Sequence, residues 1–419
     1  MGARPPSAEA GAVDDAAARA ATADGSAGRR AVLLLHFGGP QSEGEVEPFL
    51  RELFADRDCI QLPLGVLWQG WFARRVARRR APQTAAQYAA IGGGSPLVPT
   101  TFAQAEALSA ALRAAGLEAP VVVGMRYTAP FVRDAVARLR ALGAADVVAL
   151  TMYPHYSVAT AGSAFNAMVR AFDAVGWAPD RLVVVPAWHT QPGYVRALVA
   201  RIGEGLEALG VAREDVHLLF SAHGLPARYV RRGDPYLTQI QQTVEAACRA
   251  LAWPADRMSL AFQSRVGPVR WLEPETADAI DRLAAEGVRA LLVVPVSFVG
   301  EHIETLYEID VLYRQRAAEA GIDAFGRAPA LDVHPQLVEA LRDVVVEAFR
   351  SPVARCVRCL LPERAGSDPR RRCRDCGFRR PRFVRWLAAR GATGCAAASG
   401  GCGGRAAVCA GQTPPAQEG

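Results

Sequence analysis

Two short segments place histidine and carboxylate side chains where a binding cleft is expected. The first is an apolar run at 216–221, which leads through Ala222 into His223 and a Gly-Leu-Pro turn. The second is an apolar run at 291–299, followed by Gly-Glu-His-Ile-Glu at 300–304. Open α/β sheets bind ligands just beyond the carboxyl ends of their strands. A histidine at that place can accept a proton near neutral pH or bind a metal ion.

The carboxylates of the second segment are spaced as on one face of a helix. Glu304 and Glu308 are related as i, i+4, and Glu301 precedes Glu304 by three residues. Like charges stacked in this way lower stability unless protons or cations occupy the stack. Charge runs are usually solvated helical faces, but this one begins directly at the end of a strand. We therefore predict a conduit through which a metal ion enters or protons leave.

An alternation of apolar runs and helical stretches positions these segments. Buried parallel strands are predicted at 31–37, 120–124, 146–152, 182–186, 216–221, 258–262 and 290–296. Helices are predicted at 102–115, 129–142, 194–209, 236–251 and 273–287, and a helix at 336–349 closes the compact part. Seven strands are many for one sheet with a cleft. We predict an α/β fold of two doubly wound halves, residues 31–190 and 191–350.

Composition indicates a globular protein with a sizeable core, since 51% of the residues are hydrophobic and 21% charged. A net charge of +6 over 419 residues gives no reason to expect a nucleic-acid partner. Residues 1–30 are predicted to be disordered, and they lack the basic start and apolar stretch of a signal peptide. No apolar run is long enough to span a bilayer. These features predict a cytoplasmic protein.

Many motifs, in order from about residue 31 to 349, resemble those of the ferrochelatase family. The chain carries Leu-His-Phe-Gly-Gly-Pro (35–40), Leu-Phe-Ala-Asp-Arg-Asp (53–58), Tyr-Ala-Ala-Ile-Gly-Gly-Gly-Ser-Pro (88–96), Gly-Met-Arg-Tyr (124–127), Tyr-Pro-His-Tyr-Ser (153–157), Ser-Ala-His-Gly-Leu-Pro (221–226), Gln-Ser-Arg-Val-Gly-Pro (263–268) and Glu-His-Ile-Glu-Thr-Leu (301–306). Each motif alone is weak, but this number in register is specific. The resemblance implies two Rossmann-like halves with a cleft between them, and a lyase that inserts ferrous iron into protoporphyrin IX during haem biosynthesis.

The resemblance also assigns roles to single residues. It places His223 and Glu304 beside the porphyrin, where one binds iron and the other takes pyrrole protons, in an order that the sequence leaves open. His302 and Glu308 resemble more distant members of the same route. The positions that match porphyrin-contacting residues are Arg80, Tyr88 and Ser95 for the propionates, Arg126 and Tyr127 opposite the histidine, and Trp271 against the ring. Arg80 is also readable as a surface charge, and Trp271 as core packing.

Some positions depart from the family pattern. His36 and Phe37 replace a common Asn-Leu, so that Phe37 still packs the ring and His36 adds a further ligand candidate. Val158 stands where some members place a cysteine that joins the body to an iron–sulfur cluster, which argues against a cluster of that kind. The apolar segment 62–72 runs into several arginines. In the family it forms a lip over the cleft, and apolar surface rimmed by arginine suits peripheral contact with a membrane.

The end of the chain is rich in cysteine and forms a separate predicted module. Two Cys-x-x-Cys pairs are separated by thirteen residues, a spacing typical of a four-thiolate site. We predict that residues 351–390 bind structural zinc or a 2Fe-2S cluster and that residues 391–419 are disordered. The predicted ligands are Cys356, Cys359, Cys373 and Cys376, whereas Cys395, Cys402 and Cys409 are read as free thiols.

Three alternatives to protoporphyrin metallation stay open at the level of sequence. Coproporphyrin III is the alternative iron acceptor. A cobalt chelatase acting on a corrin precursor shares the architecture but lacks the combined signatures at 92–96 and 301–306. A non-catalytic porphyrin carrier needs an axial ligand but has no use for an acidic stack. The oligomeric state is not determined.

Overall fold

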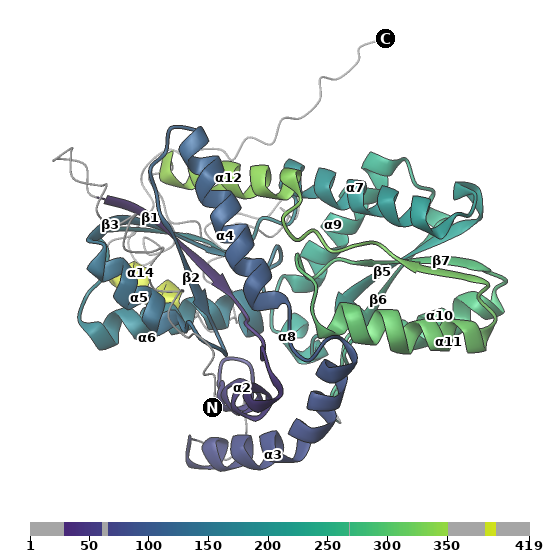
Figure 1. Cartoon of the computed structure of the whole chain (residues 1–419), viewed down its shortest axis with the longest axis horizontal. Helices are drawn as coiled ribbons and strands as arrows, with labels where there is room; N and C mark the ends of the chain where they lie inside the picture. Colours follow the sequence, from purple (N-terminus) through teal and green to yellow (C-terminus); the bar gives the residue numbers. More distant parts are fainter. Residues whose placement is uncertain (1–28, 61–65, 268, 351–381, 391–419) are drawn as a thin grey trace, which may run out of the picture.

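Two parallel sheets organise the chain, and the computed structural model describes residues 29–60, 66–267, 269–350 and 382–390 (Figure 1). The first sheet has the order β2-β1-β3-β4 and the second β6-β5-β7-β8. Their strands are β1 (Arg29–His36), β2 (Val121–Met125), β3 (Ala144–Thr151), β4 (Arg181–Val185), β5 (Val216–His223), β6 (Met258–Gln263), β7 (Ala290–Pro295) and β8 (Ala324–Arg327). Every pairing within them is parallel, which confirms the predicted α/β fold of two halves.

Helices cover both faces of each sheet, because parallel strands are apolar on both faces. On the first sheet, α4 (Leu97–Ala114) and α12 (Pro335–Arg350) lie on one face, and α5 (Val132–Ala141) and α6 (Ser163–Val175) on the other. On the second, α7 (Pro192–Leu209) and α9 (Tyr236–Leu251) lie opposite α10 (Thr276–Ala285) and α11 (Arg314–Ala320). The carboxyl ends of the strands are thereby left for loops that carry polar side chains.

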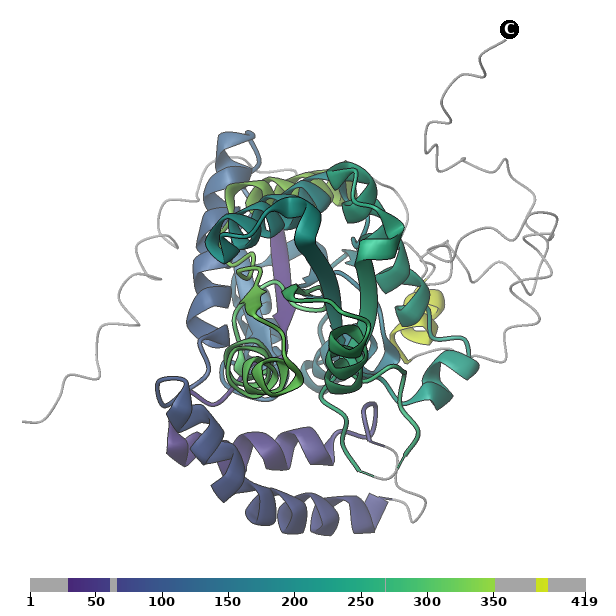
Figure 2. The ribbon, with the colours of Figure 1, turned by 90° about the vertical axis from the view of Figure 1, so that its right-hand side faces the viewer.

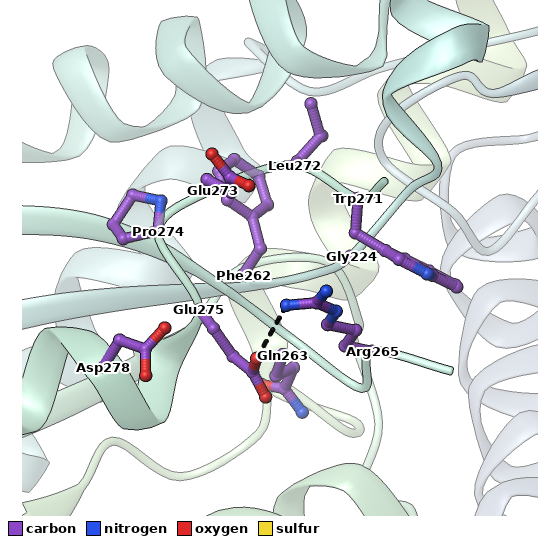
Figure 3. Close-up of a pocket in the computed structure, with 10 residues that line it drawn as sticks. All are labelled: Gly224, Phe262, Gln263, Arg265, Trp271, Leu272, Glu273, Pro274, Glu275 and Asp278. Carbon is purple, nitrogen blue, oxygen red and sulfur yellow. Dashed lines mark ion pairs between the residues drawn. The ribbon is translucent and has the colours of Figure 1, made fainter. Parts of the chain in front are cut away.

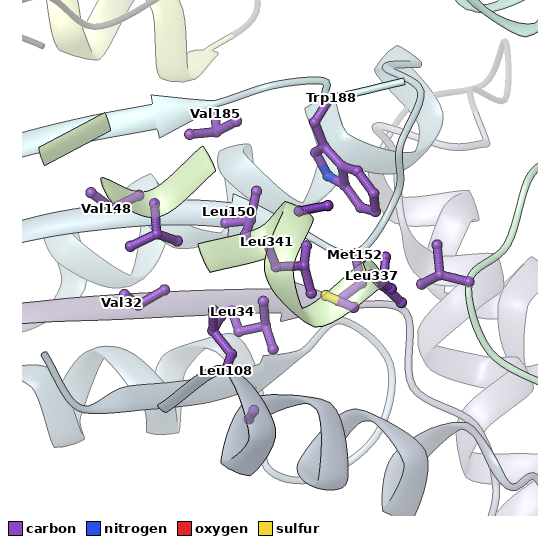
Figure 4. Close-up of a cluster of buried hydrophobic side chains, with 14 of the residues drawn as sticks. Val32, Leu34, Leu108, Val148, Leu150, Met152, Val185, Trp188, Leu337 and Leu341 are labelled. Atoms are coloured by element: carbon purple, nitrogen blue, oxygen red, sulfur yellow. The ribbon is translucent and has the colours of Figure 1, made fainter. Parts of the chain in front are cut away.

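The closing helix joins the two halves, whereas the sequence assigned it to the second. Leu337, Leu341 and Val345 of α12 are fully buried in the same core cluster as Val32, on β1 (Figure 4). The same helix also packs against α7. The boundary at residue 190 therefore does not separate two independent cores.

Three further elements differ from the prediction. Strand β8 is not predicted from the sequence, because its four half-buried residues are too few to show a period. Strand β1 begins at Arg29, inside the segment predicted to be disordered. Helices α2 (Glu43–Ala55) and α3 (Val66–Ala90) pack on each other at one end of the molecule (Figures 1 and 2). Among the helices of the described ranges, none is long and apolar enough to cross a membrane.

Helix α14 (Arg382–Ala389) belongs to the first half, although the sequence placed it in an appended module. Phe383 is buried against Phe165, with ring centroids 5.2 Å apart, and Trp386 stacks on Phe172 at 5.6 Å. The Trp386 indole N–H donates to Asp173 at 2.9 Å. The four predicted metal-binding cysteines and residues 391–419 lie outside the described residues.

We predict that Trp386→Ala lowers the free energy of unfolding by about 2–4 kcal/mol, because it removes a buried aromatic ring from α6. Urea unfolding of the full chain measures this loss. Arg385→Ala on the exposed side of the same helix is the matched control and should leave the midpoint unchanged. Equal midpoints for Trp386→Ala and wild type would show that α14 adds nothing to the stability of the first half.

Candidate active site

His223 ends strand β5, and hydrogen bonds to its backbone hold it there. Its N–H donates to Ser297 Oγ at 2.9 Å, and its carbonyl accepts from the Tyr236 hydroxyl at 2.9 Å. Burial lowers the pKa of the His223 imidazole, although the charge of Glu304 acts in the opposite direction. The imidazole is therefore neutral at pH 7 and keeps a lone pair for a proton or a metal ion.

Glu304 lies between two imidazoles. Its Oε2 is 2.5 Å from Nδ1 of His302, and its Oε1 is 3.9 Å from Nδ1 of His223. The second distance is too long for a hydrogen bond, and His223 Nδ1 is buried without a partner among the described residues. Burial acts to raise the pKa of Glu304, but the charge and hydrogen bond of His302 and the charge of His223 outweigh it and bring the pKa to about 2. Glu304 is thus an ionised carboxylate.

Glu308 lies on the same helix and has the opposite character. Its carboxylate accepts from Ser264 Oγ at 2.7 Å and from Gln263 Nε2 at 3.3 Å. Burial, together with the negative charge of Glu304, raises its pKa to about 7. Two carboxylates with pKa values moved apart form a natural pair for proton transfer. Here Glu304 stays ionised while Glu308 titrates at neutrality.

The helix that carries both carboxylates is a π-helix, η4 (Glu304–Tyr313), and not the ordinary α-helix that the spacing predicted. π-Helical turns are rare in proteins overall, and many of those that occur are found at functional sites. Glu301 is not part of the carboxylate stack. Its side chain accepts from Arg327 at 2.9 Å and from the Ala330 N–H at 3.1 Å, so its charge is compensated. Arg327 comes from β8, the strand that the sequence did not reveal.

The first half carries the three residues predicted to contact the porphyrin propionates. Tyr88 is buried, and burial, together with the negative charge of Glu304, raises the pKa of its hydroxyl. Ser95 anchors the turn after β1, where its N–H donates to Pro40 at 2.7 Å. A Cβ on Gly39 would lie 2.6 Å from Ser95 Oγ, so this turn requires glycine. Arg80 lies 5.8 Å over the ring of Phe54, on α2.

Arg126 and Tyr127 bind a buried carboxylate that the sequence had not assigned to the site. Asp56 Oδ2 accepts from the Tyr127 hydroxyl at 2.6 Å and pairs with Arg126 Nη2 at 2.9 Å. Burial acts to raise the pKa of Asp56, but Arg126 and the hydrogen bonds lower it overall. Polar atoms of both residues are thus occupied by Asp56. Their predicted place opposite His223 stays a prediction.

A pocket of about 460 Å³ lies beside the end of β5 and is shown in Figure 3. Trp271 forms one side and packs on Gly224, where a Cβ would lie 3.0 Å from the indole ring. Gln263 lines the pocket and also donates to Glu308. Arg265 and Glu275 face each other across it at 3.7 Å. Because Gly224 directly follows His223, Trp271 lies beside the site.

Fold and side chains together define an α/β protein with a proton-transfer site, made of a neutral imidazole, an ionised carboxylate and a titrating carboxylate at the strand ends. Residues 29–349 match the family model described as Ferrochelatase. The chain is 46% identical over 323 residues to the ferrochelatase of Gloeobacter violaceus, covering 75% of this chain and 96% of that protein. It is 43% identical over 332 residues to that of Synechocystis sp., covering 78% and 84%. The chain belongs to the ferrochelatase family, lyases that insert a metal ion into a porphyrin.

Solved structures are similar at a greater distance. The chelatase SirB from Bacillus subtilis, in a structure with Fe³⁺, is 13% identical, with a TM-score of 0.44 over 77% of this chain and 96% of that one. A protein of Deinococcus radiodurans described as similar to chelatases, DR2241, is 15% identical, with a TM-score of 0.44 over 77% and 56%.

Proposed function

We propose that this chain inserts ferrous iron into protoporphyrin IX, with His223 and Glu304 as the groups that meet the metal and the pyrrole nitrogens. The position of ionised Glu304 between two imidazoles supports this most directly. Insertion requires the loss of two pyrrole protons and the delivery of a cation that has shed its water. Neutral His223 has a lone pair for the first proton or for iron, and Glu304 compensates the positive charge.

Protons then have a route away from the porphyrin. A proton leaves a pyrrole nitrogen for His223 or Glu304 and passes to Glu308, whose pKa of about 7 lets it accept and release a proton at neutral pH. Ser264 and Gln263 hold Glu308 by hydrogen bonds, and Gln263 opens onto the pocket of Figure 3. Water in that pocket is the natural final acceptor.

The decisive assay supplies the purified full chain with ferrous iron under anaerobic conditions, with protoporphyrin IX and with coproporphyrin III in parallel. We expect haem to form faster from protoporphyrin IX. Preference for coproporphyrin III would assign the alternative substrate. Porphyrin binding without metallation of either compound would instead identify a carrier, and cobalt insertion into a corrin precursor would identify the third alternative.

Glu308→Gln should lower turnover about tenfold, since an amide cannot relay protons. Wild-type turnover should rise as the pH passes through about 7, where Glu308 ionises, and turnover of the variant should not show this rise.

The stability of the fold should depend on pH in the opposite sense. The native state holds the Glu308 proton more tightly than the unfolded chain, so wild-type stability falls as pH rises from 4.5 to about 7. Above that window Glu308→Gln should be more stable than wild type by roughly 1–3 kcal/mol.

Both effects are measured on the same preparations, by turnover against pH and by thermal unfolding at pH 5 and pH 8. Glu319→Gln, on exposed α11, is the matched control and should change neither profile. If turnover of Glu308→Gln still rose with pH near 7, Glu308 would not be part of the proton route. If wild type and Glu308→Gln differed in stability by the same amount at pH 5 and at pH 8, the buried charge of Glu308 would have no energetic consequence.

We propose that α3 contacts an anionic membrane surface while porphyrin is collected. Trp68 and Trp71 are 53% and 51% exposed, and Arg75 lies 5.8 Å over the Trp71 ring. Exposed tryptophans beside arginines suit the interfacial region of a bilayer. The full chain should sediment with phosphatidylserine vesicles, and replacing both tryptophans by serine should abolish this. Phe102→Ser, at a similarly exposed site on α4, is the control. Equal sedimentation of all three proteins would contradict the proposal.

We further propose that Cys356, Cys359, Cys373 and Cys376 bind one structural metal centre. All four lie outside the described residues, so the proposal rests on the donor set, four thiolates in two Cys-x-x-Cys pairs. Metal analysis and visible absorption of the full chain distinguish zinc from 2Fe-2S. A chain that holds neither after expression with both metals supplied would show that these are ordinary thiols.

A further inference from the structure

The main chain of His223 lies at the point where the neighbouring strand β7 has ended. Strand β5 pairs with β7 as far as Ser221, which lies opposite Pro295, the last residue of β7. The Ser221 carbonyl faces β7, because it accepts from the Val296 N–H at 3.1 Å. Alternate residues of a strand face the same neighbour, so the N–H and carbonyl of His223 face this side as well. Here β7 no longer provides a strand partner for them.

Two hydroxyl groups take the place of that strand partner. The His223 N–H donates to Ser297 Oγ at 2.9 Å, and the Tyr236 hydroxyl donates to the His223 carbonyl at 2.9 Å. The two hydroxyls are 2.7 Å apart. The only proton of the Tyr236 hydroxyl is used on the carbonyl, so Ser297 must donate to Tyr236. The three bonds form a closed ring, in which each hydroxyl both donates and accepts and each bond strengthens the next.

Tyr236 is itself held in place from the other half of the molecule. It is the first residue of α9, and its N–H donates to Asp234 Oδ1 at 3.0 Å. The second oxygen of Asp234 accepts from Ser157 Oγ at 3.0 Å and from the Val158 N–H at 2.8 Å, both in the segment that follows β3. The hydrogen-bonded ring is thus connected to the first half as well as to the second.

The His223 side chain has weaker contacts than its main chain. Its Nδ1 lacks a hydrogen-bond partner among the described residues, and Glu304 Oε1 is 3.9 Å away. Phe298 packs edge-on against the imidazole, with ring centroids 5.8 Å apart. The place of the imidazole in the site therefore depends on where the main chain of His223 is held.

We propose that Ser297 and Tyr236 are positioning residues, which act as one hydrogen-bonded unit to hold His223 in the geometry needed for metal insertion. This inference rests on the proposed function, in which His223 meets the metal or the pyrrole nitrogens. A displacement of about 1 Å in a reacting group can cost about a hundredfold in rate. The two hydroxyls should therefore matter for turnover although neither has to touch the substrate.

Turnover of the full chain with ferrous iron and protoporphyrin IX tests this role. We expect Tyr236→Phe and Ser297→Ala each to lower kcat by about tenfold to a hundredfold, and to change the KM for porphyrin by less than about twofold. Because loss of either hydroxyl opens the ring, the double variant should be no more than about threefold slower than the slower single variant.

Tyr229→Phe is the matched control for a general loss of stability. The Tyr229 hydroxyl donates to the Cys59 carbonyl at 2.7 Å, and Tyr229 and Tyr236 are both 6% exposed. Each change to phenylalanine removes one buried bond from a tyrosine to a main-chain carbonyl, so the two variants should have similar midpoints of urea unfolding. Only Tyr236→Phe should lose kcat.

Side-chain ¹⁵N NMR of the full chain, labelled at its seven histidines, follows His223 without turnover. The signals of His223 are those missing from His223→Ala. We expect Tyr236→Phe and Ser297→Ala to shift or broaden these signals, and Tyr229→Phe to leave them unchanged.

Three results would overturn the positioning role. They are wild-type kcat in folded Tyr236→Phe or Ser297→Ala, an equal loss of kcat in Tyr229→Phe and Tyr236→Phe, and single effects that multiply in the double variant. Near-normal turnover of His223→Ala would count against the proposed function instead, and the NMR signals would still show whether the two hydroxyls hold His223.

Discussion

His223→Ala should reduce metal insertion by about 10²–10⁴-fold, the usual contribution of a residue that transfers protons in the reaction. The alanine removes the neutral imidazole from the end of β5 and leaves Glu304 Oε1 facing an empty space. The backbone N–H and carbonyl of residue 223 keep their bonds to Ser297 and Tyr236, so the fold should persist. The initial rate of haem formation at saturating iron and porphyrin measures the effect.

Two controls make this result interpretable. Porphyrin binding, followed by fluorescence quenching, should change little, because ring packing does not depend on one imidazole. His217→Gln, a histidine at the opposite end of the same strand whose side chain contacts Ser259, should keep wild-type turnover. Near-normal turnover in folded His223→Ala would place the reaction elsewhere in the molecule.

Glu304→Gln should reduce turnover by about 10²–10³-fold, more severely than the corresponding change at Glu308. The amide has the size of the carboxylate but no charge for the cation and no basic oxygen for the proton. It also ends the close contact with His302, in which the two atoms are now 2.5 Å apart. Turnover with ferrous iron and, separately, metal binding without porphyrin should both fall.

Stability provides a second measurement at Glu304. The pKa of Glu304 is about 2 in the native state, below its ordinary value of 4.5, so ionised Glu304 stabilises the fold above pH 4.5. This contribution is lost as pH falls from 4.5 towards 2. Glu304→Gln should therefore unfold at a lower temperature than wild type at pH 7, and this gap should be narrower at pH 3. Iron insertion at the wild-type rate, with normal porphyrin binding, would show that the carboxylates serve only the structure.

Sequence alone was sufficient for the elements that depend on local pattern. Strands β5 and β7 are continuous apolar runs, and such runs form buried parallel strands. Residues at the carboxyl ends of parallel strands in one sheet meet at one edge. For that reason the pattern of the chain predicted that His223 and the carboxylates of Glu304 and Glu308 lie near a cleft, whereas His302 was assigned to the site by the family resemblance.

Tertiary structure decided which of the charged groups are free to act. Glu301 is as acidic in sequence as Glu304, but Arg327 of β8 neutralises it. Arg126 and Tyr127 match a functional motif, yet both side chains bind Asp56, which directly follows α2 and is far from them in the sequence. The reason is physical: spacing along the chain determines which side chains share an edge or a face. The proton state and availability of each group depend on partners that only long-range folding brings within bonding distance.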